Sequence, residues 1–287
     1  MYDIIIEAIK KKRELSSLDN DFIKRIVDFY FVKNPKIKKK LEAHPKIEKS
    51  KEFEIFFKDI RKILHEVYGV FNLKSKEREE LLSLLEESIS KSRKIDNEVV
   101  ELHKKILATH LSTRERLKYY RTIYENIFKY TGRPSRILDL GAGLNPFSYI
   151  FMNISSVEYT ASEISSEDIR FIQRYFKLIS TYKRIIGATI KLDLIFDKTF
   201  PDADVCFLFK VLDSLENLKR NISMEILNNI KAKYIVVSFP TKSLTGKNIS
   251  KKRLSWFLKI VKRLSYSYET FEVPNEVFYI LKTGKIY

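Results

Sequence analysis

The stretch that most constrains the fold is Ile137–Phe147, which reads Ile-Leu-Asp-Leu-Gly-Ala-Gly-Leu-Asn-Pro-Phe. Its first four residues are predicted to form a short buried strand, followed by a glycine turn and the start of a helix. Gly141 and Gly143 can adopt backbone angles that a side chain would forbid, so the turn can come close to a ligand. Asp139 lies near the carboxyl end of the strand, where open parallel sheets bind ligands. The stretch predicts either a cofactor-binding turn or an ordinary strand–turn–helix corner.

The glycine spacing distinguishes between cofactors. A nicotinamide-type fingerprint would place a third glycine near position 146, where this chain has Pro146. Asp-x-Gly-x-Gly followed by Asn145 and Pro146 resembles instead motif I of S-adenosylmethionine (SAM) methyltransferases. Glu163 lies about twenty positions beyond the turn, a spacing at which an acid can accept both ribose hydroxyls of a nucleoside. We therefore expect SAM as the cofactor.

From Arg136 onward, predicted strands alternate with predicted helices, which is typical of a parallel sheet. Five strands are expected at Ile137–Leu140, Val157–Ala161, Gly187–Leu192, Val205–Phe209 and Tyr234–Phe239. Two more, near Tyr266–Val273 and Val277–Lys282, are expected to form an antiparallel pair that closes the sheet. Ser165 is the predicted N-cap of the helix after the second strand. The fold class is α/β with a mostly parallel seven-stranded sheet.

The segment Thr109–Leu117 precedes the first strand and is rich in Ser, Thr and Arg. One interpretation is a well-capped linker helix, with Ser112 or Thr113 as N-cap and Glu115 completing the cap, running through Tyr130. The other is a carboxylate-binding segment, because an arginine can clamp a carboxylate with two hydrogen bonds.

The N-terminal third is predicted to be all-helical, since apolar residues recur at three- and four-residue spacing over residues 1–107. The clearest stripe is the one that starts at Phe53 and continues to Val67, with Gly69 as the expected C-cap. Pro35 precedes a basic run, Lys36–Lys40. We therefore predict two domains, a helical one over 1–107 and a methyltransferase domain over 108–287.

The formal net charge of +17 favours a polyanionic partner, most often nucleic acid, although a Lys-rich proteome would also produce it. The charge is uneven, with +5 over residues 1–110 and +12 over 111–287. The segment from Lys242 to Arg263, both included, has eight basic residues and no acid. Trp256 and Phe257 lie within this segment and could stack on a flipped base, or pack a helix onto the sheet.

Several protein classes are disfavoured. Cys206 is the only cysteine, which rules out an internal disulfide and fits a reducing cytoplasm. One cysteine and four scattered histidines make a structural zinc site improbable, so no metal is expected. No long apolar run could span a bilayer, and the first residues do not resemble a signal peptide.

Three separated stretches together resemble one family. His110-x-Ser-Thr-x-Glu-Arg116, Ile137–Pro146 and Val236–Gly246 are similar in order and spacing to the aminoglycoside-resistance 16S rRNA (guanine-N7) methyltransferases, which include Sgm, ArmA and RmtB. Leu208–Glu216 fits the same family. The resemblance covers roughly residues 108–246. It implies a class I SAM-dependent methyltransferase fold preceded by a helical rRNA-docking domain.

The resemblance also implies roles for individual residues. Arg116 would hold the SAM carboxylate, Glu163 the ribose and Asp193 the adenine, while Lys210 and Lys242 would lie beside the target nucleotide and form the catalytic set. The full set of expected cofactor-binding residues is His110, Arg116, Asp139, Gly141, Gly143, Asn145, Glu163, Asp193 and Leu194. Expected RNA-binding residues are Lys36, Lys38, Lys39, Lys40, Lys247, Lys251, Lys252 and Arg253. The expected partner is 16S rRNA in the 30S subunit, bound by a cytoplasmic monomer.

The residues that are absent agree with N7 chemistry. A guanine N7 has a free lone pair, so the enzyme needs positioning rather than a general base. No Asn/Asp-Pro-Pro-Tyr motif follows the fourth strand, as exocyclic-amine methyltransferases commonly have, and Cys206 lies inside an apolar strand. Glu163 departs from the family, whose members usually have Asp there. Two alternatives stay open: a methyltransferase acting on another RNA such as tRNA, or a non-catalytic RNA-binding protein with a SAM fold.

Overall fold

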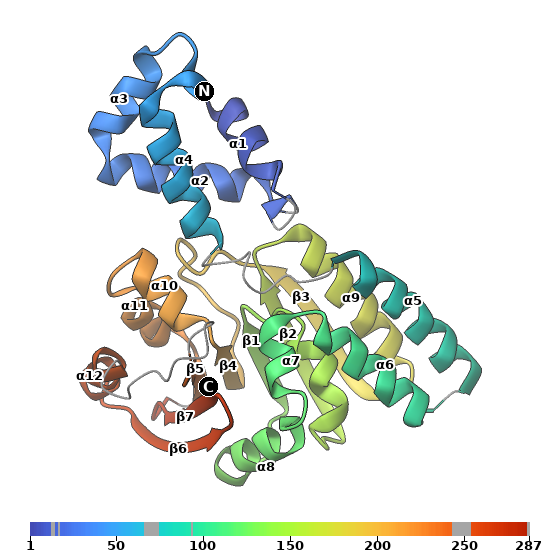
Figure 1. The fold of residues 1–287 in the computed structure, drawn as a ribbon. Helices are drawn as coiled ribbons and strands as arrows, with labels where there is room; N and C mark the ends of the chain where they lie inside the picture. Colours follow the sequence, from blue (N-terminus) through green and yellow to red (C-terminus); the bar gives the residue numbers. More distant parts are fainter. Residues whose placement is uncertain (13–14, 17, 66–74, 93, 243–253, 286–287) are drawn as a thin grey trace.

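The computed structural model describes residues 1–12, 15–16, 18–65, 75–92, 94–242 and 254–285. Figure 1 shows an N-terminal lobe of helices projecting from one edge of a larger domain that contains a central sheet. The larger domain has helices on both faces of its sheet, which is the layering expected from the alternating pattern in the sequence.

The sheet has seven strands in the order β3-β2-β1-β4-β5-β7-β6. The strands are β1 (Arg136–Leu140), β2 (Ser156–Glu163), β3 (Arg184–Lys191), β4 (Ala203–Phe209), β5 (Ala232–Pro240), β6 (Ser267–Val273) and β7 (Glu276–Lys282). The first five are mutually parallel, whereas β7 pairs antiparallel with both β5 and β6. The predicted sheet, including its closing antiparallel pair, is confirmed.

Each face of the sheet has its own hydrophobic core, because alternate residues of a strand point to opposite faces. Cys206 and Leu208 of β4 pack with α10 (Leu212–Leu218), α11 (Ile222–Asn229) and α12 (Ser255–Arg263). Val205 and Phe207 pack on the other face, with α8 (Tyr120–Thr131) and α9 (Ser166–Ser180) among the covering helices. Since both faces are covered, β4 reads as an uninterrupted apolar run. Cys206 is fully buried, as its apolar neighbours predicted.

The N-terminal lobe consists of α1 (Tyr2–Lys10), α2 (Asn20–Lys33), α3 (Pro35–Ala43), the short 3-10 helix η2 (Ile47–Lys49) and α4 (Lys51–Leu64). In α4 the hydroxyl of Ser50 accepts the N–H of Phe53 as N-cap, and Phe53, Phe56, Ile60 and Leu64 of the predicted apolar stripe are buried. The end of the stripe at Val67 lies outside the described residues. The basic run after Pro35 is helical and forms most of α3. The predicted C-cap, Gly69, lies outside the described residues.

Two helices of the N-terminal third pack with the sheet domain rather than with the lobe. They are α5 (Ser75–Ser92) and α6 (Asn97–Ala108). Arg174 on α9 forms ion pairs with Glu79 and Glu86 of α5, and His103 of α6 lies against Tyr175 of α9. Their apolar residues belong to the core that α8 and α9 share. The domain boundary at residue 107 stays a prediction, and this packing leads us to propose that it lies between α4 and α5.

The segment before β1 differs from its predicted form. Helix α7 (Leu111–Arg116) begins after His110, so the predicted N-cap at Ser112 or Thr113 is wrong. The Thr113 hydroxyl instead donates to the carbonyls of Leu107 and His110, which fixes the segment against the end of α6. The predicted helix through Tyr130 is divided into α7 and α8, and its predicted end at Gly132 is confirmed by a φ of 69° there.

Candidate active site

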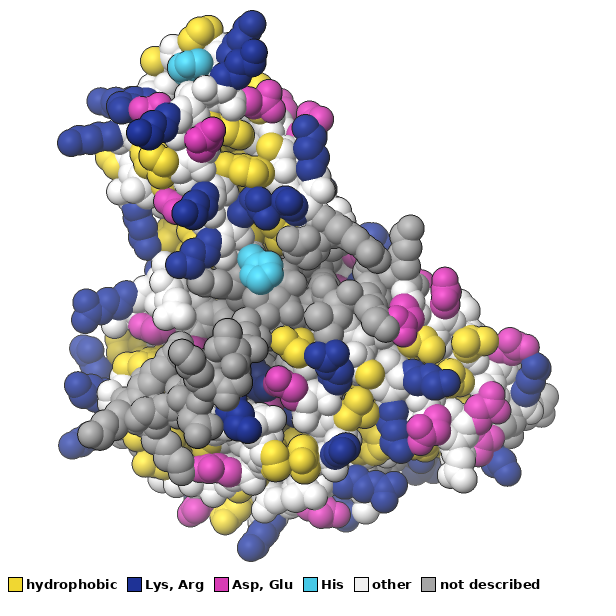
Figure 2. All heavy atoms as spheres, in the orientation of Figure 1, with side chains coloured by type: hydrophobic (Ala, Val, Ile, Leu, Met, Phe, Trp, Pro, Cys, Tyr) yellow, Lys and Arg dark blue, Asp and Glu magenta, His cyan; other side chains and the backbone are white. Residues whose placement is uncertain are grey.

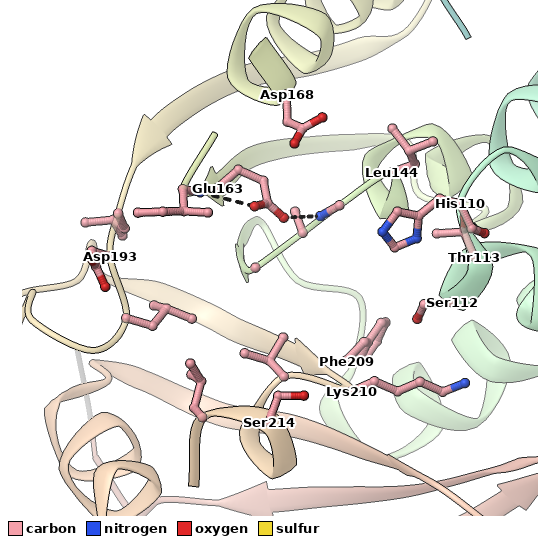
Figure 3. Close-up of a pocket in the computed structure, with 18 of the residues that line it drawn as sticks. His110, Ser112, Thr113, Leu144, Glu163, Asp168, Asp193, Phe209, Lys210 and Ser214 are labelled. Atoms are coloured by element: carbon pink, nitrogen blue, oxygen red, sulfur yellow. Dashed lines mark hydrogen bonds between the residues drawn. The ribbon is translucent and has the colours of Figure 1, made fainter. Parts of the chain in front are cut away.

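A pocket opens at the carboxyl edge of the central strands, where β1 passes into the glycine turn. Its empty space is about 1020 Å³, part of which is open to solvent. Figure 3 shows side chains entering it from several directions, with Glu163 and Asp193 on one side and His110 and Lys210 on the other. In parallel α/β sheets this edge is where ligands bind, because the loops after the strands diverge there.

The glycine turn forms the floor of the pocket. Gly141 and Gly143 have φ values of 65° and 53°, in the left-handed region that glycine tolerates best. A Cβ on Gly143 would lie 3.1 Å from the His110 ring, and the Gly143 N–H donates to Glu163 Oε1 at 2.6 Å. The turn is therefore held between His110 and Glu163. Residues 145–151 then continue as a 3-10 helix, η4 (Asn145–Phe151), rather than an α-helix.

Glu163 ends β2 and is held by two backbone donors. Its Oε1 accepts from Gly143, and its Oε2 accepts from the N–H of Ile164 at 3.1 Å. Burial, reinforced by the nearby negative charge of Asp168, raises the pKa of Glu163 to about 7, although the two backbone hydrogen bonds act in the opposite direction. An acidic side chain in the middle of the pocket can accept bonds from a vicinal diol.

Asp139 and Asn145 lie directly behind the pocket rather than in its lining. Asn145 Nδ2 donates to Asp139 Oδ2 at 2.9 Å, and the Tyr159 hydroxyl donates to the same oxygen at 2.6 Å. Burial raises the pKa of Asp139 to about 6, and these two hydrogen bonds limit the rise. The two residues flank the glycine turn behind the pocket, so their placement supports a role in holding the turn rather than in contacting a ligand.

Arg116 lies at the opposite end from Asp193 and is almost completely buried. Its Nε lies 3.1 Å from both carboxylate oxygens of Glu276, its Nη1 donates to Asn145 at 3.3 Å, and its Nη2 donates to the Ser112 hydroxyl. Each terminal nitrogen carries a second N–H that these contacts do not use. Burial alone would lower the pKa of Arg116, but the charge and hydrogen bond of Glu276, together with the nearby Tyr120 and Tyr124, more than offset it, so the net shift is upward.

Glu276 is one of the site residues that the sequence analysis missed. It is 1% exposed, begins β7, and contacts both Arg116 and the Lys210 ammonium, the latter at 3.3 Å. It shares no motif with the glycine turn. The signal that could have found it is its place at the head of the apolar run Val277–Leu281, since an acid there must enter the sheet with a buried partner.

Lys210 follows β4 and has a φ of 60°, which is uncommon for a residue with a side chain. Its backbone N–H donates to the carbonyl and hydroxyl of Ser238, which fixes this conformation. Its ammonium is bound by Glu115 and Glu276. A positive side chain thus lines the pocket in a fixed orientation, and the backbone strain there is of the kind that structures keep at functional sites.

Asp193 and Leu194 line the far end of the pocket, after β3. Asp193 Oδ1 accepts the Ile195 N–H at 3.1 Å, while Oδ2 lies 3.1 Å from Nη2 of Arg25, a residue of α2. Burial raises the pKa of Asp193, and the Ile195 hydrogen bond and the Arg25 charge oppose the rise. Phe22, also on α2, contributes to the lining. Neither α2 residue was expected in the site, although they are three apart and so share one face of that helix.

Arg78 of α5 also reaches the pocket, where it forms ion pairs with Asp168 at 2.7 Å and Glu167 at 3.2 Å. Burial and the nearby cations Arg116, Arg78 and Lys210 lower the pKa of His110 to about 3. His110 is therefore neutral at physiological pH.

Most of the predicted cofactor residues come together. The structure brings His110, Arg116, Gly141, Gly143, Glu163, Asp193, Leu194 and Lys210 to one pocket. Lys242 does not line it: the residue is exposed and follows the end of β5. Phe257 is fully buried and packs edge-to-face against Phe239, as does the partly buried Trp256, so the packing interpretation of these two rings is the one observed.

The predicted RNA-binding residues separate into two groups. Lys36, Lys38, Lys39 and Lys40 all lie on α3, where Lys38 and Lys40 form ion pairs with Glu42 and Glu52. Lys247, Lys251, Lys252 and Arg253 lie outside the described residues. Figure 2 shows many Lys and Arg side chains over the N-terminal lobe, with some acidic side chains among them, and more along the margin beside α10–α12; over α5 and α6 basic and acidic side chains are mixed.

Among the residues that the structure describes, no group of three or more His, Cys, Asp or Glu side chains is arranged to hold a metal ion. Within the same ranges, no helix has the length and apolar composition needed to cross a membrane.

The comparisons with known proteins agree with one another. The sequence matches a family model described as "Ribosomal RNA methyltransferase (FmrO)" over residues 38–280. A curated relative from Micromonospora echinospora, named 16S rRNA (guanine(1405)-N(7))-methyltransferase, is 30% identical over 224 residues, which are 76% of this chain and 79% of the relative.

Two solved structures share the fold. A crystal structure of the 16S rRNA methyltransferase RmtF in complex with S-adenosyl-L-homocysteine superposes with a TM-score of 0.74 at 22% identity, covering 98% of this chain and 97% of that one. The 16S rRNA methylase RmtB superposes with a TM-score of 0.69 at 20% identity, covering 98% of each chain. At these identities the likeness concerns the fold, and it extends over the N-terminal lobe as well as the sheet domain.

Proposed function

Since the chain belongs to the FmrO family of ribosomal RNA methyltransferases, we propose that it transfers a methyl group from SAM to the N7 of a guanine in 16S rRNA. The observation that carries the proposal is the joining of the glycine turn to Glu163, through the hydrogen bond from Gly143 at the carboxyl edge of the sheet. The base and the atom come from the names of the relatives, and the guanine in those names, position 1405, is the expected target.

The pocket fits SAM in its donor and acceptor set. Arg116 has N–H groups left for a carboxylate, Glu163 offers a carboxylate to ribose hydroxyls, and Asp193 offers acceptors to an adenine amino group. A side chain on Gly143 would come into close contact with the His110 ring, so glycine at this position keeps the floor of the pocket unobstructed. Leu194 and Ile195 supply apolar surface beside Asp193, as a purine ring requires.

For methyl transfer to a guanine N7 the protein mainly has to position the cofactor and the target base. When bound, SAM supplies an electrophilic methyl group on a sulfonium, which the N7 lone pair of guanine can take without losing a proton. The pocket accordingly needs no general base, and neutral His110 serves as a wall against the glycine turn. Lys210, held by Glu115 and Glu276, would fix the edge of the pocket where the target base enters. Lys242 is exposed near the same edge of β5 and is proposed to contact RNA there.

The substrate is proposed to be the 30S subunit, bound by a cytoplasmic monomer. The basic face of the N-terminal lobe supports an rRNA contact, with Lys36 and Lys39 exposed on α3. Phosphate contacts release counterions, so the affinity for 30S should fall steeply as salt is raised. An affinity that barely changed between low and moderate salt would argue against this surface as the docking face.

The direct test is transfer of radiolabelled methyl from SAM to isolated 30S subunits, with free rRNA and tRNA in parallel. Chain cleavage after borohydride and aniline treatment then reports N7-methylguanine. Label on 30S with cleavage at position 1405 is the expected result, and Glu163→Ala should abolish it. Label on tRNA alone would support SAM as the cofactor but contradict 16S rRNA as the substrate. No label on any RNA from a protein that binds SAM would favour a non-catalytic role.

A further inference from the structure

The adenine end of the pocket, defined here by Asp193, Leu194 and Ile195, is not built by the sheet domain alone. Phe22 and Arg25 of α2, in the N-terminal lobe, close it from outside. Phe22 is 2% exposed and belongs to the core that the lobe shares with β4 and β5. The Arg25 guanidinium lies over the Phe196 ring, 5.7 Å from its centroid, while its Nη2 reaches Asp193.

The two oxygens of Asp193 are held from different sides. The sheet domain holds Oδ1 through the Ile195 N–H, and the lobe holds Oδ2 through Arg25. The side chain of Asp193 is 2% exposed, and besides Ile195 and Arg25 a backbone hydrogen bond from Phe196 also acts on its carboxylate. A carboxylate can accept several hydrogen bonds, which leaves sites for a ligand amino group beside both contacts.

We propose that Arg25 is a positioning residue of the cofactor site, through which the N-terminal lobe orients Asp193 toward the adenine amino group. The inference rests on the proposed use of SAM. Loss of Arg25 frees Oδ2 and removes the cation that offsets the burial of Asp193, which favours its protonated form. A protonated carboxyl has fewer acceptor sites for an amino group.

The lobe has other attachments, so the effect of Arg25 can be separated from the docking of the lobe itself. Asp19, which precedes α2, accepts the N–H and hydroxyl of Ser166 at 3.0 and 2.9 Å and pairs with Lys191 at 2.9 Å. At the other end of α2, the Lys33 ammonium donates to the Leu218 carbonyl at 3.1 Å. These contacts remain in an Arg25 variant.

The experiment compares two ligands by calorimetry: S-adenosylhomocysteine and its analogue in which the purine lacks the 6-amino group. Arg25→Met should lower the affinity for S-adenosylhomocysteine about fivefold, which is the range of a partly exposed ion pair. It should change the affinity for the analogue by less than about twofold. Lys33→Met is the matched control, since it removes a cation from the same helix and a contact between lobe and sheet domain without touching Asp193. It should leave both affinities unchanged.

A second readout follows from linkage, because a ligand that binds better with α2 in place must also hold α2 in place. S-adenosylhomocysteine should slow amide exchange in α2 of the unchanged protein, and should slow it less in Arg25→Met. Equal weakening of both ligands by Arg25→Met would assign the residue a purely structural part and overturn the inference, as would unchanged affinities. If the unchanged protein bound neither ligand, the proposed function itself would fail.

Discussion

The two ends of the cofactor pocket each carry an arginine paired with a carboxylate, and the two pairs differ in where their members come from. The side chains of Arg116 and Glu276 are both 2% exposed, and both residues belong to the sheet domain. Arg25 and Asp193 join the N-terminal lobe to the sheet domain, and the arginine side chain is 41% exposed. The arginine–carboxylate pair is therefore buried at one end of the pocket, whereas at the other end its arginine is exposed to solvent.

The difference has an energetic meaning. Removing one member of an enclosed pair leaves a charge without solvent or partner, which costs several kcal/mol. In the Arg25–Asp193 pair the arginine keeps much of its hydration, so this pair contributes less, on the order of 1 kcal/mol, because water and salt screen it. The Arg116 end of the pocket is thus fixed when the sheet domain folds, whereas the Asp193 end is completed by a contact that is weak enough to open. Three substitutions test this contrast.

The largest effect is expected from Glu276→Gln. The amide keeps the shape of the side chain but leaves Arg116 and Lys210 without the carboxylate that lies between them. We expect the free energy of unfolding to fall by about 3–5 kcal/mol, measured by denaturant titration without ligand. The matched control is Glu269→Gln on the exposed strand β6, which should change stability by less than about 0.5 kcal/mol. A loss from Glu276→Gln as small as that of the control would remove the contrast between the two ends.

The intermediate effect concerns Glu163, between the two ends. Its pKa, raised to about 7 in the unliganded protein, means that it is mostly protonated below neutral pH. Ribose hydroxyls donate best to the ionised form, so the affinity for S-adenosylhomocysteine should rise by about tenfold per pH unit up to pH 7 and level off above it. Titration calorimetry between pH 5.5 and about 8.5 measures this profile.

Glu163→Gln separates the carboxylate from its neighbours. The amide cannot ionise, so this variant should bind more weakly than the unchanged protein at pH 8 and should show little pH dependence around neutrality. Asp193, whose pKa burial also raises, stays in place in the variant. A slope that survived in Glu163→Gln would assign the pH dependence to Asp193 instead.

Much of the fold could be predicted because it depends on local patterns. The β4 residues Val205–Phe209 are apolar on both faces, which indicates a strand buried on both sides. The two glycines after β1 indicate a turn with positive φ angles, which both residues have. The family resemblance read from three short stretches is confirmed by the match over residues 38–280. Ser165 caps α9 as predicted, through a hydrogen bond from the Asp168 N–H.

The residues that sequence reasoning missed all act across long sequence separations. Glu276 lies 160 residues from Arg116 in the chain, and the antiparallel pairing of β5 with β7 places Glu276 opposite Pro240, where Arg116 can reach it. Arg25 meets Asp193 because α2 docks on the sheet edge. Helical periodicity gives the buried face of α2 but not what that face packs against. Ser112 was misjudged because its hydroxyl is taken by Arg116, a tertiary contact that competes with capping.

The smallest effect is expected from Asp19→Ala, which weakens the open end without touching Asp193. Asp19 is partly exposed and accepts from Ser166 and Lys191 across the junction of the two parts. We expect the α2 amides to exchange about fivefold faster, since loss of such a contact costs about 1 kcal/mol. Asp21→Ala is the matched control, because it removes an exposed acid from the same helix end and so shares any helix-dipole effect.

The direction of the Asp19 pKa shift tells over which pH range its contact with Ser166 and Lys191 is present. Burial by itself raises the pKa of Asp19, but the bonds from Lys191 and Ser166 more than offset it, so the net shift is below the ordinary value of 3.8. A depressed pKa means that the contact is fully present above pH 3.8 and is lost as the pH falls through the lower value in the folded protein. The difference in α2 exchange between Asp19→Ala and the unchanged protein should therefore persist at neutral pH and vanish only in acid. Equal exchange at pH 7 would mean that the remaining contacts, among them those of Phe22, Arg25 and Lys33, hold the lobe without Asp19, and the Asp193 end would then be less open than its exposed arginine indicates.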